Sequence, residues 1–425
     1  MAALAALALG AVWLGGLVRL VLLADGFLLA LLLFDFLRAG DPSRARVRRT
    51  LPARVKLGLE FERVLELDGL RPGCALAVYE AYPSTFEALE GAPELAHADA
   101  GGRARLARRY RAGLRGRFVL GDVRLRVRGP LGLVERQARL AGEQAVAVEP
   151  ALLRLAETLR LAASERWRDL GVRTLRRRGG QSEFEALREY VPGDEPRRMD
   201  WKASARRVRT MVRSYQVERG QELILLLDRG RRMRAPGGTG THAAWTKLDW
   251  ALDCALEIAA VALRQGDRVG CAVFERGLEV YVAPDKGARA GARLNEVLFP
   301  LQPAEHEADL ARALRELAVR HRRRATVLIL SDVADPLSLA DQRSALASGA
   351  RHHRLVFAAL DDPELARAAA DPSDAALQAA AGECVAERER SLRALSSSGA
   401  RVLSALPAEA ASPLLAALLD ERRGR

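Results

Sequence analysis

Two apolar stretches decide the fold of the C-terminal half. Residues 221–228 read QELILLLD, and residues 325–332 read ATVLILSD. Each is a continuous apolar run without polar alternation, which is typical of a strand buried on both faces of a sheet. Each also ends in an aspartate, Asp228 or Asp332. Because parallel strands bring their carboxyl ends to one edge, we expect both aspartates at the crevice where such sheets bind ligands.

Amphipathic segments and further strands alternate with these two runs. Apolar residues at helical spacing predict helices over 243–264, 307–321, 375–397 and 412–422. Shorter apolar runs predict strands over 268–274, 278–282, 354–360 and 401–405. This alternation predicts an α/β domain over residues 221–425, with a parallel sheet covered by helices on both faces.

Residues 38–150 have a different pattern, typical of a small antiparallel β-sandwich. Short alternating runs are separated by Gly and Pro, as at Pro72-Gly73 and Gly129-Pro130. Residues 124–128 read RLRVR, which places arginines on one face of a strand and apolar side chains on the other. We interpret the arginine face as solvated, with contact to phosphates or lipid headgroups as the alternative. A helical segment over 152–173 then opens a linker that covers 151–220.

The N-terminus is predicted to lie in a membrane. Residues 2–37 are apolar except for Arg19, Asp25 and Asp35. A helix of this length would run roughly 54 Å, longer than a hydrocarbon core of about 30 Å. We therefore expect a transmembrane hairpin in residues 1–37, with short spans over 2–18 and 21–37; a cleaved signal peptide is the alternative. The arginines that follow predict an inner-membrane protein with its bulk in the cytoplasm: Arg38, Arg44, Arg46, Arg48 and Arg49.

Composition narrows the classes of function. The chain has 425 residues, of which 49% are hydrophobic, so an extensive core can form. Its formal charge is +13, and only four of its 67 basic residues are lysines. An arginine bias of this kind is typical of a GC-rich genome, so nucleic-acid binding, suggested by charge alone, is not expected. The four cysteines are isolated, which argues against a disulfide framework or a zinc site.

A charged stretch over 176–207 separates the two predicted domains. Glu, Asp and Arg alternate there around Phe184 and Trp201. We interpret it as a structural clasp in which ion pairs surround an apolar floor. The alternative is an enzyme that uses the carboxylates of residues 183–206, but no nucleophile, base and orienting group are seen together.

This stretch resembles the bacterial Domain of Unknown Function 58 family. The resemblance rests on the pattern EF…LREY.PGD..R..DWKASAR between Gly180 and Arg213, on the strand that ends at Asp228, and on the N-terminal piece 129–133, GPLGL. The positions that carry the family motif are Gly180, Ser182, Glu183, Phe184, Arg188, Tyr190, Gly193, Asp194, Arg198, Asp200, Trp201, Ala205 and Arg206.

The resemblance implies more than the residues alone. Members of the family resemble von Willebrand factor A domains in their C-terminal half, so the expected fold is an α/β von Willebrand factor A-like sheet. Members are also typically encoded beside MoxR-type AAA+ ATPases and other membrane proteins. The resemblance therefore implies a membrane-anchored, non-enzymatic interaction module that acts with such an ATPase.

The metal site of that fold is degenerate in this chain. It would read Asp-x-Ser-x-Ser after the first strand, but Gly230 and Arg232 stand where the serines would be. With Asp228 and Asp332 remaining, we expect no metal and no cofactor, and we expect Arg232 or Arg231 to bridge the two carboxylates instead. The arginines of this loop are also the expected partner-binding residues: Arg229, Arg231, Arg232 and Arg234.

Overall fold

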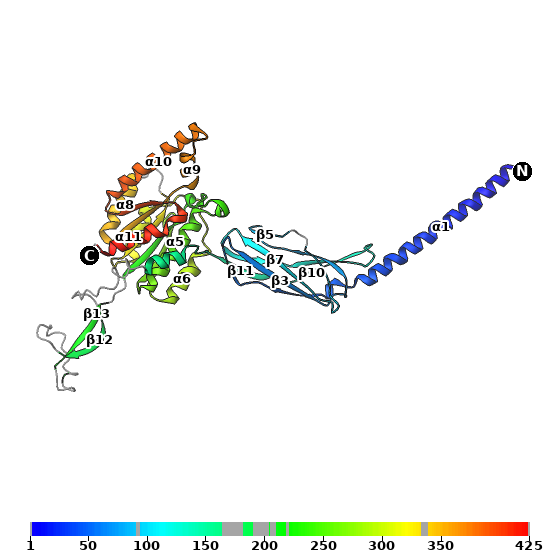
Figure 1. Ribbon diagram of the computed structural model, residues 1–425, viewed down its shortest axis with the longest axis horizontal. Coiled ribbons are helices and arrows are strands. Elements are labelled where there is room, and N and C mark those ends of the chain that lie inside the picture. The colour runs from blue at the N-terminus through cyan, green and yellow to red at the C-terminus, as the bar shows by residue number, and fades with distance from the viewer. Residues whose placement is uncertain are drawn as a thin grey trace. The chain divides into compact units, whose positions relative to one another are not determined.

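The structure is a computed structural model that describes residues 2–90, 94–163, 182–189, 204, 210–217, 221–332 and 339–423. The chain divides into two compact units, Met1–Ala151 and Leu152–Arg425 (Figure 1). The first unit contains an apolar helix and antiparallel sheets. The second contains a mixed sheet with helices on both faces.

Helix α1 runs without interruption from Ala2 to Ala39. The expected hairpin is therefore wrong. The segment between Arg19 and Asp25 contains only Leu, Val and Ala, and no glycine or proline that would favour a turn. The part from residue 18 onward is long and apolar enough to cross a membrane, and almost none of it is buried within the protein.

The strands of the first unit form three small sheets. Two of them, β1-β3-β7-β5 and β10-β9-β4-β6, are antiparallel, and in the third, β2-β11-β8, strands β2 and β11 run parallel. The inner faces of the first two share one core that includes Leu65, Val78, Leu106 and Leu125. The strands are β1 (Arg46–Thr50), β2 (Arg54–Lys56), β3 (Glu60–Asp68), β4 (Ala75–Glu80), β5 (Phe86–Ala88), β6 (Glu94–His97), β7 (Ala104–Ala112), β8 (Gly116–Leu120), β9 (Val123–Arg128), β10 (Glu135–Leu140) and β11 (Gln144–Glu149).

The alternation in β9 has the predicted consequence. Val123, Leu125 and Val127 are buried, while the arginines between them are exposed. The expected antiparallel sheets are thus confirmed. One arginine of the basic run that follows α1 behaves differently, because Arg49 is buried and its guanidinium donates to the carbonyls of Leu120 and Gly121.

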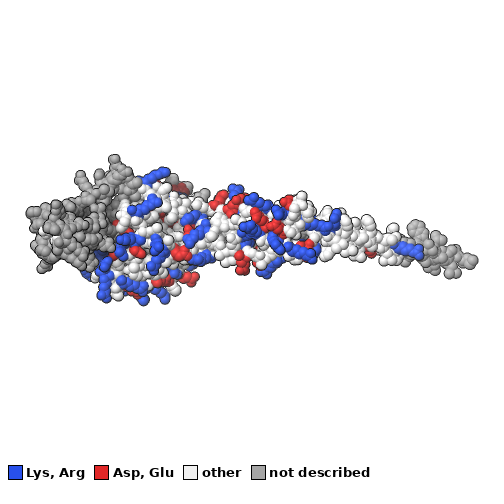
Figure 2. Space-filling view, turned by 90° about the horizontal axis from the view of Figure 1, so that it is seen from below, with Lys and Arg blue, Asp and Glu red and all other residues white. Residues whose placement is uncertain are grey.

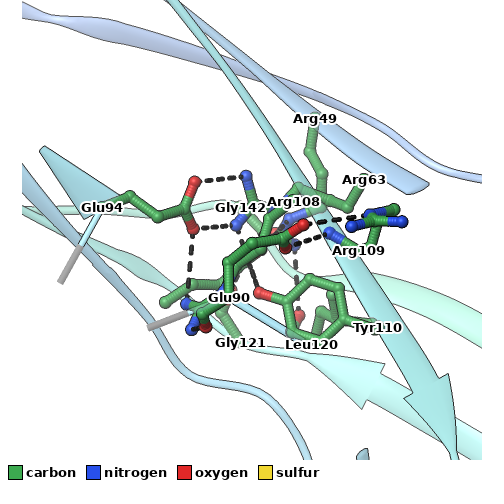
Figure 3. A network of polar contacts seen from close by, with 11 residues as sticks. Arg49, Arg63, Glu90, Glu94, Arg108, Arg109, Tyr110, Leu120, Gly121 and Gly142 are labelled. Atoms are coloured by element: carbon green, nitrogen blue, oxygen red, sulfur yellow. Dashed lines mark hydrogen bonds and ion pairs between the residues drawn. The ribbon is translucent and has the colours of Figure 1, made fainter. Parts of the chain in front are cut away.

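A buried ionic network crosses between the two larger sheets (Figure 3). The carboxylate of Glu80 on β4 lies 2.6 Å from Arg49 Nε and 2.7 Å from Arg63 Nε, and Tyr110 donates a hydrogen bond of 3.1 Å to it. Arg63 and Glu80 have no exposed side-chain surface, and Arg63 also pairs with Glu94 on β6. Burial raises the pKa of Tyr110 to about 12, with a further contribution from the charge of Glu80.

The second unit is built on one six-stranded sheet of order β16-β15-β14-β17-β18-β19. All neighbours are parallel except the edge pair β15 and β16. The expected α/β architecture is thus confirmed, although the sheet is mixed and not wholly parallel because β16 is antiparallel. The strands are β14 (Glu222–Asp228), β15 (Arg268–Phe274), β16 (Leu278–Asp285), β17 (Thr326–Ser331), β18 (Arg354–Leu360) and β19 (Arg401–Ala405).

Helices cover both faces of this sheet (Figure 1). One face packs against α5 (Lys247–Arg264), α6 (Ala288–Leu298) and α11 (Ala411–Arg423), and the other against α7 (Leu310–Arg320), α8 (Leu339–His352) and α10 (Ala375–Ser396). Helix α9 (Pro363–Ala370) contacts α10. The sequence patterns did not predict α6, α8 or α9.

The start of the expected helical linker is helical, and residues 164–181 lie outside the described residues. Helix α2 covers Leu155–Ala163. In the segment just before it, the backbone N–H groups of Leu152 and Arg154 donate to the buried carboxylates of Asp253 and Glu257 on α5. Farther along, β12 (Ser182–Glu189) and β13 (Met211–Val217) pair as an antiparallel ribbon, which the sequence patterns did not predict.

The ionic network gives a stability prediction. Glu80→Ala should lower the free energy of unfolding by roughly 3–5 kcal/mol, because it leaves Arg49 and Arg63 buried without their shared counterion. The control Glu87→Ala removes a carboxylate that is 65% exposed and pairs with Arg111, and should cost less than about 1 kcal/mol. Chemical denaturation of the purified full chain in detergent measures both. Equal losses for the two variants would contradict the assigned role of the network.

Candidate functional site

A crevice of about 960 Å³ opens at the carboxyl ends of β14 and β17. The chain leaves β14 toward β15 on one side and leaves β17 toward β18 on the other, so this is the point at which the strand order reverses. Ligands of open α/β sheets bind at such points. The crevice extends between α7 and α8. Its polar floor is formed by Asp228, Gly230, Arg232, Ser331 and Asp332.

Asp228 lies at this floor and is 4% exposed. Its carboxylate accepts hydrogen bonds from the hydroxyl of Ser331 at 2.5 Å and from the backbone N–H of Gly230 at 2.6 Å. Burial, with a smaller contribution from the nearby charge of Asp332, raises the pKa of Asp228 to about 6 against these hydrogen bonds. Of the two aspartates of the floor, Asp228 is therefore the one that titrates nearer neutrality.

Gly230 is required by the backbone that passes beside it. A Cβ atom there would lie 2.8 Å from the backbone nitrogen of Ala308 and 3.1 Å from Asp228. A serine at this position would therefore collide with the segment that precedes α7. The packing of the loop after β14 against Ala308 thus requires a glycine at the position where the metal site would have a serine.

Two cations hold the second aspartate. Lys247 Nζ lies 2.6 Å from one carboxylate oxygen of Asp332, and Arg388 Nη1 lies 2.8 Å from the other. Burial opposes ionisation, but Lys247 and then Arg388 outweigh it and hold the pKa of Asp332 below its usual range. The expectation that Arg231 or Arg232 bridges Asp228 and Asp332 is therefore wrong for Asp332, because the bridging charge comes from helices α5 and α10.

Lys247 carries a local signal that the sequence interpretation missed. Thr246 accepts a hydrogen bond from the backbone of Asp249, and Asp249 accepts one from the backbone of Thr246, so the two form a capping box. Such a box marks the first turn of a helix, which puts Lys247 at the carboxyl edge of the sheet. Arg388 lies late in α10 and has no comparable signal.

The four arginines of the loop after β14 pair with glutamates of the same unit. Arg229 lies 2.8 Å from Glu279, Arg231 lies 2.6 Å from Glu307, and Arg232 lies 3.7 Å from Glu307. Arg234 lies 3.8 Å from Glu305. The side chains of Arg231 and Arg234 are still more than half exposed. Both side chains can therefore contact a partner, because the ion pairs that they form with Glu307 and Glu305 are exposed to solvent.

Basic and acidic side chains are interspersed on the face shown in Figure 2. Exposed pairs in the first unit follow the same pattern, as with Arg128 and Glu135 at 2.7 Å and Arg109 and Glu90 at 3.0 Å. Much of the arginine excess on this face is thus mixed with carboxylates.

The family motif is only partly described. Ser182, Glu183, Phe184 and Arg188 belong to β12, whose backbone pairs with β13. The proposed clasp and the alternative enzyme site cannot be placed, because their other residues lie outside the described residues: Gly180, Tyr190, Gly193, Asp194, Arg198, Asp200, Trp201, Ala205 and Arg206. In the described part of the chain, no three His, Cys, Asp or Glu side chains converge as metal ligands would.

Comparison with known proteins places the second unit in context. Residues 186–378 match the family described as Protein of unknown function DUF58. An uncharacterized protein of Mycobacterium tuberculosis is 34% identical over 217 residues, which are 49% of this chain and 64% of that protein. The uncharacterized protein YeaD of Bacillus subtilis is 32% identical over 123 residues, which are 27% of this chain and 28% of YeaD.

The match to these relatives is thus partial, since the chain spans 64% of the length of the mycobacterial protein. Among solved structures, a cohesin module from Clostridium perfringens covers 24% of this chain at 14% identity. Its TM-score of 0.18 is too low to bear on the fold.

Asp228 gives a pH prediction. Its pKa is about 6 in the folded protein and 3.8 ordinarily, so between these values the folded state holds a proton that the unfolded state has released. The contribution of Asp228 to the free energy of unfolding should therefore fall by roughly 3 kcal/mol as the pH rises from about 4 to about 6. Denaturant unfolding of the wild type and of Asp228→Asn over this range isolates the effect. Parallel pH profiles would contradict it.

Proposed function

We propose that this protein is a membrane-anchored, non-enzymatic interaction module that acts with a MoxR-type AAA+ ATPase. The observation that carries the proposal is the crevice at the strand-order reversal. Its polar groups contact one another, since Ser331 donates to Asp228 while Lys247 and Arg388 pair with Asp332. Groups engaged in this way suit a recognition surface better than a reaction centre.

Anchoring is supported by α1. Its apolar side chains from Val18 onward are largely exposed, including Leu23 at 72% and Phe27 at 67%. Exposed apolar surface on this scale needs an apolar environment. The resemblance to membrane-anchored relatives and the arginines after α1 support an inner-membrane location with the bulk of the chain in the cytoplasm.

The topology can be tested directly. An alkaline phosphatase fused after Arg425 should be inactive in cells, because the enzyme needs an oxidising compartment to fold, whereas a fluorescent protein at the same position should be bright. High phosphatase activity would place the second unit outside the cytoplasm and would overturn the orientation. Extraction of the full chain by detergent but not by alkaline carbonate would test the anchoring separately.

The proposal also predicts where the ATPase binds. Arg231 and Arg234 belong to the loop that also carries Gly230 and Arg232 of the crevice, and their side chains are more than half exposed, so the pairs they form with a partner should behave as rim contacts. Arg231→Glu/Arg234→Glu should therefore lower the association rate about tenfold at low salt, with a smaller effect at high salt. The control Arg322→Glu/Arg393→Glu makes the same charge change away from the crevice.

The measurement is a surface-plasmon-resonance titration of the detergent-solubilised full chain with a MoxR-type AAA+ ATPase from the same organism. Loss of affinity that is equal for the two double variants would show that net charge, and not this surface, controls the association. Absence of any binding by the wild-type chain would contradict the proposed partnership itself.

A further inference from the structure

A buried aspartate near the end of the apolar helix α1 joins it to the β-sheets of its own unit. Asp35 has no exposed surface. Its carboxylate accepts three backbone hydrogen bonds, from Leu131 at 2.7 Å and from Leu133 and Val134 at 2.8 Å each. The donors all belong to residues 129–134, the loop between β9 and β10 that includes GPLGL. The loop therefore acts as a receptor for one carboxylate of the helix.

Two glycines give the loop this shape. Gly132 adopts φ of +70°, which favours glycine, and its N–H donates to the carbonyl of Gly129 at 3.0 Å. Gly129 faces the aspartate, and a Cβ atom there would overlap the Asp35 carboxylate. Successive backbone N–H groups that converge on an anion in this way form a nest. The glycines of this motif thus have a physical role that the sequence alone did not show.

Two arginines of the first unit also bind backbone carbonyls at the end of α1. Arg71 donates to the carbonyl of Leu37 at 2.6 Å, and Arg136 donates to the carbonyl of Gly40. Arg136 also pairs with Asp41 at 3.2 Å and lies 4.6 Å from the ring centre of Phe36. The end of α1 is therefore fixed to the sheet at several points on different residues.

This docking places the apolar tip of the loop beside the apolar helix. Leu131 and Leu133 are each 47% exposed, and on the helix Phe34 is 48% exposed and Leu37 is 62% exposed. Leu131 and Leu133 themselves donate backbone N–H groups to Asp35, so they lie level with the last turns of α1. Exposed apolar side chains therefore continue from the helix onto the loop.

Positive charge lies beside this apolar surface. Arg38 is exposed, and its guanidinium lies 5.6 Å from the ring centre of Phe34. The side chain of Arg44 is 84% exposed. Arginines next to exposed apolar groups are the arrangement that the interface of an anionic bilayer favours, because headgroup phosphates pair with guanidinium while the apolar groups enter the acyl boundary.

We propose that loop 129–134 is a second membrane contact, in which Leu131 and Leu133 enter the interface of the bilayer that α1 spans and Arg38 and Arg44 face anionic headgroups. The proposal rests on the proposed anchoring by α1. It commits to a lipid surface because the exposed apolar surface is continuous with that of the helix. The β-sheets would then stand at a fixed orientation on the membrane.

The test uses the full chain in nanodiscs that contain doxyl-labelled phosphatidylcholine with or without phosphatidylglycerol. An environment-sensitive fluorophore is attached to single cysteines in a Cys384→Ser background, since Cys384 is the exposed cysteine and the other three are buried. The fluorophore is attached at Leu131→Cys to test the loop, at Phe27→Cys as the membrane reference and at Val119→Cys as the aqueous reference. Val119 is 54% exposed and belongs to β8. It lies just before the start of β9, whereas Leu131 follows the end of β9.

The expected result is quenching at position 131 that is at least half of that at position 27, with little at position 119. Phosphatidylglycerol should increase the quenching at position 131, and Arg38→Gln/Arg44→Gln should remove that increase. If position 131 behaves like position 119 while position 27 is quenched, the loop contact is overturned and the anchoring by α1 stands. If position 27 is also unquenched, the anchoring itself fails.

A second pair of variants tests the role of the Asp35 nest. Gly129→Ala should displace the Asp35 carboxylate and reduce the quenching at position 131 by at least twofold. The control Gly142→Ala adds the same methyl group, with only an ordinary contact to Val47 at 3.6 Å, and should leave the quenching unchanged. Unchanged quenching in Gly129→Ala would show that the nest does not position the loop, and would overturn that part of the inference.

Discussion

One carboxylate, that of Asp332, connects the three layers of the second unit. It sits at the end of β17, and its two oxygens pair with Lys247 from α5 and with Arg388 from α10. These helices pack on opposite faces of the sheet. Arg388 also binds Asp361 and the carbonyl of Leu360 after β18, so the network extends along the carboxyl edge. The crevice has its shape because these charges are satisfied within the protein.

The same interaction explains how the floor differs from an ion site. A divalent cation needs several oxygen ligands that are free to turn toward it. Here the oxygens of Asp332 face an ammonium and a guanidinium, and Gly230 leaves no room for a hydroxyl side chain. Burial raises the pKa of Asp228 because its two neutral hydrogen-bond donors only partly offset the loss of solvent, whereas Lys247 and Arg388 lower the pKa of Asp332. Two acids that share one edge thus acquire opposite properties from their different partners.

The sequence predicted the parts of the fold that depend on local pattern. The apolar runs 221–228 and 325–332 became β14 and β17 because strands buried on both faces leave an unambiguous signal. Helix α8 was missed because its buried residues are few, with Ala345, Leu346 and Gly349 forming a weak stripe. The hairpin prediction failed because length alone suggested two spans, whereas residues 19–25 contain nothing that stops a helix.

Only those residues of the candidate site that lie at the ends of strands could be predicted from the sequence. Parallel order brings Asp228 and Asp332 to one edge, and the sequence showed this. Their partners could not be read in the same way, since Lys247 and Arg388 lie 85 and 56 residues from Asp332 along the chain. The same limit applies to Arg49, which was counted among the basic residues that set the membrane orientation and whose side chain is buried against Glu80 on another strand.

The network around Glu80 has a consequence for how the first unit assembles. Its charges come from β1, β3, β4, β6 and β7, which belong to two different sheets. The arginines lie on one sheet and the glutamates on the other, so packing of the sheets in any arrangement that separates them would bury charges without counterions, at a cost of several kcal/mol. Partly paired intermediates are therefore strongly disfavoured. The two sheets should form together in a single cooperative transition, so that a fragment lacking any one of these strands would not retain a stable sandwich.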